Sequence, residues 1–136
     1  MTEKEIIDDF LAQRKIAVIG VSRSRSKYGN AVFRDLMRKG YNVFAINPGA
    51  EMIEGEPCYP NLKALPEPVD GIVSVVPPRQ TERVVREAAQ VGIKRIWMQP
   101  GAESKDAIHF CRENNLNVVY GRCVMVLSVP IDAGDQ

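Results

Sequence analysis

Apolar residues fall along the chain in short runs, separated by segments in which they recur at helical spacing. Four short runs are mostly apolar and are each followed within two residues by glycine, proline or asparagine, which is typical of strands buried on both faces. They predict strands at residues 15–19, 42–46, 71–75 and 94–98, and a fifth is predicted at 117–120.

The segments between these strands predict amphipathic helices. Thr2 and Glu5 have the spacing of a capping box and predict a short first helix. Further helices are predicted at residues 30–39 and 81–91, and another from Ser104 to about residue 113. A loop rich in proline, glycine and glutamate follows the second strand, with a short helix at 61–65. The apolar run 123–129 is expected to cover an edge of the core or to add a short strand.

The alternation of strands and helices predicts the fold class. Strands that are apolar throughout and separated by helices form parallel sheets covered on both faces. We therefore expect a Rossmann-like, three-layer α/β fold with a five-stranded, mainly parallel sheet. Residues 1–136 are expected to form a single domain.

Composition and charge exclude several classes of function. The chain has 18 basic and 17 acidic residues, so its net charge of +1 gives no reason to expect binding to nucleic acid or to a membrane. No apolar run approaches the roughly 20 residues that span a membrane, and the polar start does not resemble a signal peptide. The three cysteines form no CxxC pair. Together these features predict a cytoplasmic protein with reduced thiols.

The exits of the predicted strands are the strongest indication of a site. In open α/β sheets, ligands bind beyond the carboxyl ends of the strands. Glycine permits close approach of a ligand to the backbone, and proline fixes the shape of a loop. Four exits on one edge combine such residues and predict a shared site: Gly20-Val21-Ser22, Asn47-Pro48-Gly49, Val76-Pro77-Pro78 and Gln99-Pro100-Gly101-Ala102.

The first exit indicates a ligand with several phosphates. Arg23, Arg25 and Lys27 precede a helix start near Gly29, where free N–H groups favour phosphate. The loop is neither a Walker A sequence nor GxGxxG, because Ser22 stands at the second glycine position. The second strand also ends without the acidic residue that holds the ribose of NAD. A nucleotide carrying an extra phosphate therefore fits better than a dinucleotide.

Four segments carry a resemblance to a known family. They read AVIGVSRSRSKYGNAVFRDLMRKGYNVFAINP, VDGIVSVVPP, KRIWMQPGA and YGRCVM. In this order the chain resembles, over residues 6–126, the small CoA-binding domain proteins related to the N-terminal domain of the succinyl-CoA synthetase α subunit. The resemblance implies coenzyme A as the cofactor.

The resemblance also implies roles for individual residues. The first phosphate turn would be lined by Gly20, Val21 and Ser22, and phosphates of the 3′-phospho-ADP part would be contacted by Arg25 and Lys27. A second wall of the site would be formed by Asn47 and Pro48, and the adenine or ribose would pack near Val76 and Pro77. The path of the pantetheine arm would be bordered by Gln99, Pro100, Gly101 and Ala102.

Candidate catalytic chemistry is sparse. The single histidine, His109, lies within a predicted helix and is interpreted as a structural or surface residue. Cys123 would lie near the arriving CoA thiol. Packing is the favoured interpretation of Cys123, and a mixed disulfide with CoA is the alternative. No catalytic or metal site is therefore predicted.

The leading functional hypothesis is a non-catalytic carrier, sensor or regulator that binds coenzyme A or an acyl-CoA. The alternatives are an NAD(P)-dependent oxidoreductase and a subunit of an acyl-CoA synthetase. The expected partner is a small-molecule ligand, and self-association or docking to an acyl-CoA enzyme are both left open.

Overall fold

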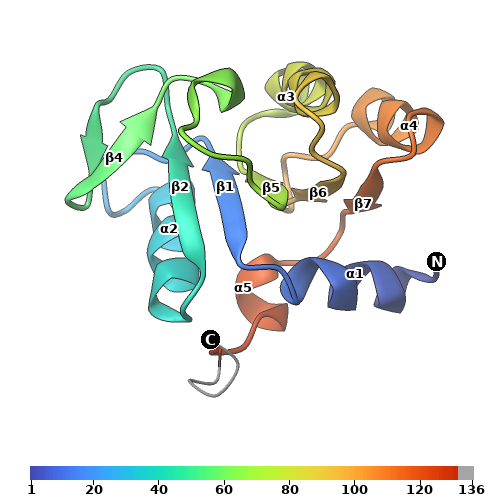
Figure 1. Ribbon diagram of the computed structural model, residues 1–136, viewed down its shortest axis with the longest axis horizontal. Coiled ribbons are helices and arrows are strands. Elements are labelled where there is room, and N and C mark those ends of the chain that lie inside the picture. The colour runs from blue at the N-terminus through green and yellow to red at the C-terminus, as the bar shows by residue number, and fades with distance from the viewer. Residues whose placement is uncertain (132–136) are drawn as a thin grey trace.

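A seven-stranded sheet forms the centre of the computed structural model, which describes residues 1–131 (Figure 1). The elements follow one another as α1 (Glu3–Leu11), β1 (Lys15–Ile19), α2 (Tyr28–Arg38), β2 (Asn42–Ile46), β3 (Met52–Ile53), β4 (Glu56–Tyr59), η1 (Leu62–Ala64), β5 (Gly71–Ser74), α3 (Pro78–Gln90), β6 (Arg95–Met98), α4 (Lys105–Glu113), β7 (Asn117–Val119) and α5 (Val124–Leu127).

The order of the strands is β3-β4-β2-β1-β5-β6-β7. All neighbouring pairs are parallel except β3 and β4, which form an antiparallel hairpin. From β1 the chain builds outward through β2 to the hairpin, then returns to place β5 on the other side of β1. This reversal puts the switch point of the sheet between β1 and β5, where ligands bind in folds of this kind.

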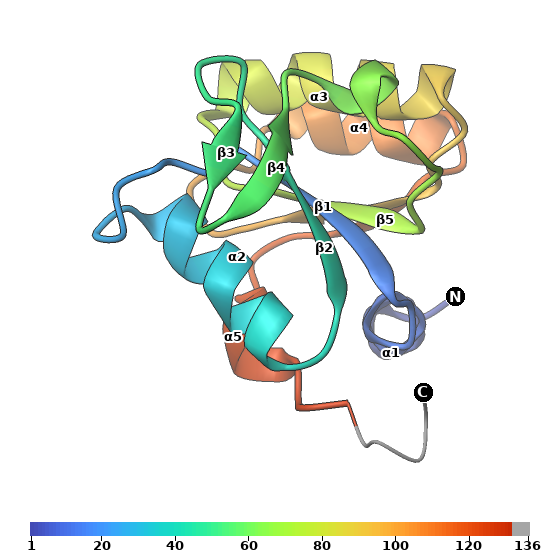
Figure 2. The same cartoon turned by 60° about the vertical axis from the view of Figure 1, so that its left-hand side comes forward.

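Two apolar cores cover the two faces of the sheet. Along β1, Ile16 and Val18 enter one core, while Ala17 and Ile19 enter the other, as the two-residue repeat of a strand requires. The first core packs against α1, α2 and α5, and the second against α3 and α4. Figure 2 shows these two groups of helices on opposite sides of the sheet. The predicted three-layer α/β architecture is therefore confirmed.

Local signals place the helix ends close to the predicted positions. The Thr2–Glu5 capping box is present, with both reciprocal hydrogen bonds formed. The Ser104 side chain accepts a hydrogen bond from the N–H of Ala107 and caps α4. The predicted short helix near residues 61–65 is a single 3₁₀ turn, capped by Asn61.

The prediction of five strands was wrong, because the loop after β2 contains β3 and β4. Each strand is short, and Pro57 lies within β4, so neither shows the alternation that identifies a strand in sequence. Their pairing depends on β2, where Ala45 and Ile46 lie opposite Cys58 and Tyr59.

The apolar run at 123–129 contains a short helix, α5, and not a strand. Val124 is buried in the core beneath α2, as the expectation of a core cover requires, whereas Val126 is exposed. The ammonium group of Lys39 donates to the carbonyl of Met125 and to the hydroxyl of Ser128, which ties this segment to the end of α2. No helix in the described part of the chain has the length and apolar character needed to cross a membrane.

The start of α2 packs against the end of β1 at two glycines. Gly20 has a φ of +98°, which other residues rarely adopt. A Cβ at Gly29 would lie 2.3 Å from the carbonyl oxygen of Gly20 and 2.8 Å from the side chain of Val75. Only glycine therefore allows the first turn of α2 to approach the strand this closely.

Replacing Gly29 with alanine is expected to lower the free energy of unfolding by about 3 kcal/mol, the upper range for overpacking. In the interior of an ordinary helix the same substitution raises the free energy of unfolding. A decrease at Gly29 would therefore identify the close approach of α2 to β1. Urea unfolding measures the effect. Gly49→Ala is the control, because a Cβ there would meet only the Asn47 side chain, at 3.4 Å. A Gly29→Ala protein as stable as the parent would contradict this account.

Candidate functional site

A cavity of about 530 Å³ opens at the carboxyl ends of β1, β2 and β5. It brings three of the four predicted exits together and contains five of the predicted binding residues, Gly20, Ser22, Asn47, Pro48 and Val76. We call it the exit cavity. Its remaining lining residues are Ile19, Ile46, Pro60, Asn61, Gln80, Arg83, Val84 and Glu87.

Hydrogen bonds from two asparagines hold the first exit loop, residues 20–27, in shape. The side-chain amide of Asn47 donates to the carbonyl of Val21 at 2.8 Å, which links the first and second exits. The amide of Asn30, a fully buried residue of α2, donates to the carbonyl of Ser22 at 2.7 Å. Each amide satisfies a loop carbonyl that the strands cannot reach. The loop is therefore fixed by residues of β2's exit and of α2.

The first exit loop leads directly into the N-terminus of α2. Lys27 is the N-cap residue, and its side chain forms no capping hydrogen bond. The first-turn N–H groups of a helix have no intrahelical acceptor and carry partial positive charge. Arg25 and Lys27 are both exposed beside this helix end. The arrangement can bind an anionic group with backbone and side-chain donors together.

The fourth exit differs from the prediction. Gln99 is fully buried and does not line the exit cavity. Its amide donates to the hydroxyl of Tyr28 at 2.6 Å and to the sulfur of Cys123 at 3.4 Å, and its oxygen accepts from the N–H of Val124 at 2.7 Å. Gln99 therefore joins β6 to α2 and α5. Ala102 is also buried, while Pro100 and Gly101 are exposed.

The buried Gln99 network gives Cys123 an unusual environment. The Tyr28 hydroxyl lies 3.5 Å from the Cys123 sulfur. Partial burial acts to raise the pKa of this thiol, but hydrogen bonds from Tyr28, Gln99 and the backbone outweigh it, so the pKa is lowered. Burial, with the neighbouring thiol, raises the pKa of Tyr28 to about 12, so the hydroxyl remains a donor at neutral pH.

The other two cysteines lie away from this environment. Both are buried, and burial raises the pKa of Cys58 and raises that of Cys111 to about 12. Cys111 packs in the core between the sheet and α4, where a buried thiol behaves as a small apolar residue. His109 is exposed on α4 beside Glu113 and does not line the exit cavity.

Several residues of the exit cavity have no signal in the sequence. Arg83, Gln80 and Glu87 lie along α3, where charged residues are expected on the solvent face. Glu87 accepts the N–H of Leu62 at 3.1 Å, which brings η1 against α3 and closes the cavity on that side. Among the described residues that line the cavity, Arg83 is the one with a positive charge.

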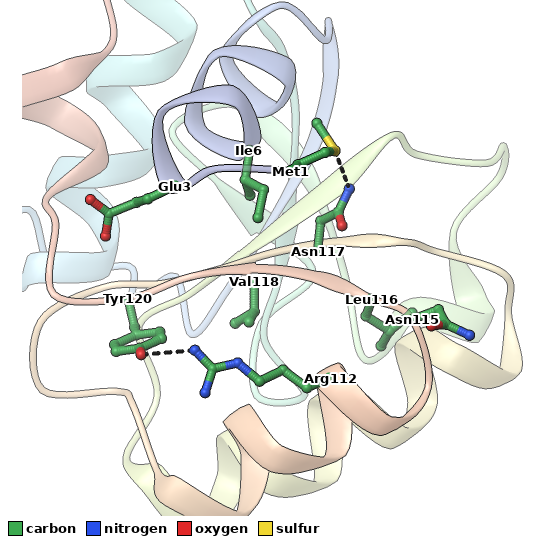
Figure 3. A pocket seen from close by; sticks show the side chains of 9 residues that line it. All are labelled: Met1, Glu3, Ile6, Arg112, Asn115, Leu116, Asn117, Val118 and Tyr120. Carbon is green, nitrogen blue, oxygen red and sulfur yellow. Dashed lines mark hydrogen bonds between the residues drawn. The ribbon is translucent and has the colours of Figure 1, made fainter.

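A second hollow, of about 440 Å³, lies along the edge strand β7, between the start of α1 and the end of α4 (Figure 3). Its polar groups contact one another: Arg112 donates to the hydroxyl of Tyr120 at 3.0 Å, and Asn117 donates to the sulfur of Met1. It shares no lining residue with the exit cavity, and none of the predicted binding residues lies in it.

Comparison with known proteins agrees with the resemblance seen in the sequence. A family model described as "CoA binding domain" matches residues 14–128. A solved structure of a conserved hypothetical protein from Pyrococcus furiosus is 44% identical, with a TM-score of 0.80, over 83% of this chain and 97% of that one.

Two curated relatives differ in length. The uncharacterized protein YneT of Bacillus subtilis is 25% identical over 92% of this chain and 93% of its own length. The alpha subunit of ADP-forming acetate–CoA ligase II from Pyrococcus furiosus is 25% identical over 90% of this chain, which spans only 29% of that subunit.

Cys123 is expected to react with iodoacetamide at lower pH than an unperturbed cysteine, because its lowered pKa gives thiolate at lower pH. Tyr28→Phe removes one donor to the sulfur and is expected to shift the midpoint of the rate–pH profile upward. Mass spectrometry of proteolytic peptides measures labelling at each cysteine, with the buried Cys58 and Cys111 as internal controls. Equal labelling of all three in the native protein would contradict this prediction.

Proposed function

The chain belongs to the family of CoA binding domains, and on this premise we propose that it binds coenzyme A or an acyl-CoA at the carboxyl ends of its strands. The observation that carries the proposal is the exit cavity, which lies beside the uncapped N-terminus of α2. The exit cavity suits a nucleoside, and the N-terminus of α2 suits phosphates. In this proposal the protein is a non-catalytic carrier, sensor or regulator.

The phosphates of the ligand would occupy the start of α2. Gly20, Val21 and Ser22 form the turn, and the close packing of Gly29 on Gly20 brings the helix N–H groups to it. Arg25 and Lys27 supply positive charge from the same loop. A hydrogen bond to a charged group contributes about 1.5–3 kcal/mol, so these donors together can favour a polyanion even in a protein of nearly neutral charge.

The adenosine part would occupy the exit cavity. Ile19, Ile46, Val76 and Val84 supply apolar surface, and Pro48 adds a rigid edge at the exit of β2. Polar side chains, Asn47, Asn61 and Gln80, surround this surface and can hydrogen-bond a base or ribose. Arg83 offers a positive charge to a phosphate placed away from the helix start, which is an addition to the predicted residues.

The pantetheine arm would leave past the exits of β5 and β6. Pro100 and Gly101 are exposed and can border it, whereas Gln99 and Ala102 are buried and would act by shaping the loop; the exposed Pro77 stays assigned to the adenine or ribose. Cys123 lies beside Gln99 and Tyr28, so packing and a mixed disulfide with the thiol of CoA are both compatible with its position.

One alternative function has separate support, and a second is disfavoured by the sequence. The relationship to a ligase alpha subunit favours a role as an acyl-CoA synthetase subunit, in which a partner would supply the chemistry. An NAD(P)-dependent oxidoreductase would use the same fold, but β2 is followed by Asn47 and Pro48, with no carboxylate to hold a ribose. A comparison of the affinities for CoA and for NAD distinguishes the oxidoreductase alternative from the proposal.

Isothermal titration with CoA, 3′-dephospho-CoA and NAD tests the ligand. CoA is expected to bind most tightly, and loss of the 3′-phosphate is expected to weaken binding about 10- to 150-fold, since one charge-assisted contact is lost. Binding of NAD in preference to CoA would overturn the proposal.

Two cations of the proposed site are tested by Lys27→Gln in the first exit loop and by Arg83→Gln on α3, each expected to weaken CoA binding about tenfold through loss of one charged contact. Lys94→Gln is the matched control, because Lys94 precedes β6 at the opposite edge of the sheet. Titration calorimetry at about 50 mM and 300 mM salt measures the change, which shrinks as salt screens the charges. An equal loss in the Lys94→Gln protein would mean that net charge, and not this site, determines affinity.

A further inference from the structure

The turn of the β3–β4 hairpin has an acidic residue, Glu54, at a position that usually holds a different type of residue. Met52 pairs with Pro57 and Ile53 with Glu56, which leaves Glu54 and Gly55 as a two-residue connection. Their φ angles of +52° and +77° are those of a type I′ turn. Asparagine, aspartate and glycine are the usual first residues of this turn, because they tolerate the left-handed conformation. Glutamate has no such advantage, so its presence needs another explanation.

The side chain of Glu54 reaches the first exit loop. One carboxylate oxygen lies 3.4 Å from Nε of Arg25, and the other accepts from the amide of Asn30 at 3.4 Å. The Glu54 side chain is 21% exposed, against 68% for Arg25. A carboxylate from the edge of the sheet therefore contacts the loop that precedes α2, on the residue that the proposed function assigns to phosphate.

The positions of the neighbouring groups fix Arg25 within reach of both Glu54 and a ligand. The carbonyl of Arg25 accepts from the guanidinium of Arg34, whose Nε donates to Asn30. The backbone of the loop is thereby held against α2, while the Arg25 side chain stays largely in solvent. Its guanidinium can turn from Glu54 to an incoming phosphate without movement of the loop.

We propose that Glu54 is an affinity-determining residue, an internal anion that competes with the phosphates of the ligand for Arg25. A phosphate that binds at the start of α2 must share Arg25 with the carboxylate and is repelled by its charge. The effect is to weaken binding and to favour ligand release. This inference rests on the proposed function, because it concerns the same site.

Calorimetric titration of Glu54→Gln with CoA tests the proposal at low salt. The substitution keeps the size of the side chain and removes its charge, so CoA is expected to bind about threefold more tightly, in keeping with the modest strength of exposed ion pairs. Glu56→Gln is the matched control, since it removes the same charge from an exposed position in the same hairpin. Its affinity is expected to equal that of the parent.

Combining Glu54→Gln with Arg25→Gln tests whether Glu54 changes the affinity for CoA through Arg25. If Glu54 acts through Arg25, the gain from Glu54→Gln disappears when Arg25 is already replaced. A gain that persists there, or one that Glu56→Gln reproduces, would overturn the inference. So would weaker or unchanged binding in Glu54→Gln, which would make Glu54 a residue that positions Arg25 or one without a role.

The same variants titrated with inorganic pyrophosphate separate the inference from the proposed function. If CoA fails to bind but Glu54→Gln binds pyrophosphate more tightly than the parent and depends on Arg25, the proposed ligand is wrong and the inference stands. If no variant binds either compound, both are overturned.

Discussion

The contact between Gly29 and the carbonyl of Gly20 is the constraint on which the site depends. With no Cβ on Gly29, α2 starts directly against the end of β1, at the strand beside the switch point of the sheet. The partial positive charge of a helix start is effective only over its first turn. A side chain at position 29 would hold α2 further from β1 and would move this charge away from the strand exits. The same contact places Asn30 under the loop and Tyr28 over Cys123.

Buried and half-buried amides transmit this constraint to the surrounding loops. Asn30 holds the first exit, Asn47 joins it to the second, and Gln99 joins the fourth to α2 and α5. Buried amides must be satisfied, because an unpaired one loses its hydrogen bonds to water without replacement. Each amide therefore fixes a loop in one conformation. Asn30 and Asn47 bind loop carbonyls, and Gln99 binds the N–H of Val124 together with two side chains. These contacts hold the exits in shape, while Arg25 and Lys27 stay exposed to solvent.

The sequence predicts the repeating part of the fold well and the irregular part poorly. Five parallel strands and the main helices follow from runs and periodicities that lie within one element, together with local caps such as Thr2 and Ser104. The β3–β4 hairpin has no such internal signal: its strands are short, and one contains Pro57. It exists because β4 pairs with β2, a contact between segments that are separated along the chain. The α5 segment likewise takes its place from Lys39 and the core beneath α2.

The sequence by itself determined the fold class and the edge of the sheet at which the exit cavity opens, because the ends of the strands and the chemistry of the loops that follow them are local properties. Only the tertiary structure decided which residues of these loops face the cavity. It turns Gln99 inward, adds Arg83 from α3, and brings Glu54 to Arg25 across 29 positions of chain. The direction of a side chain is set by the residues that pack against it. Those residues belong to elements that are distant along the chain, and local sequence patterns do not show how such elements are aligned.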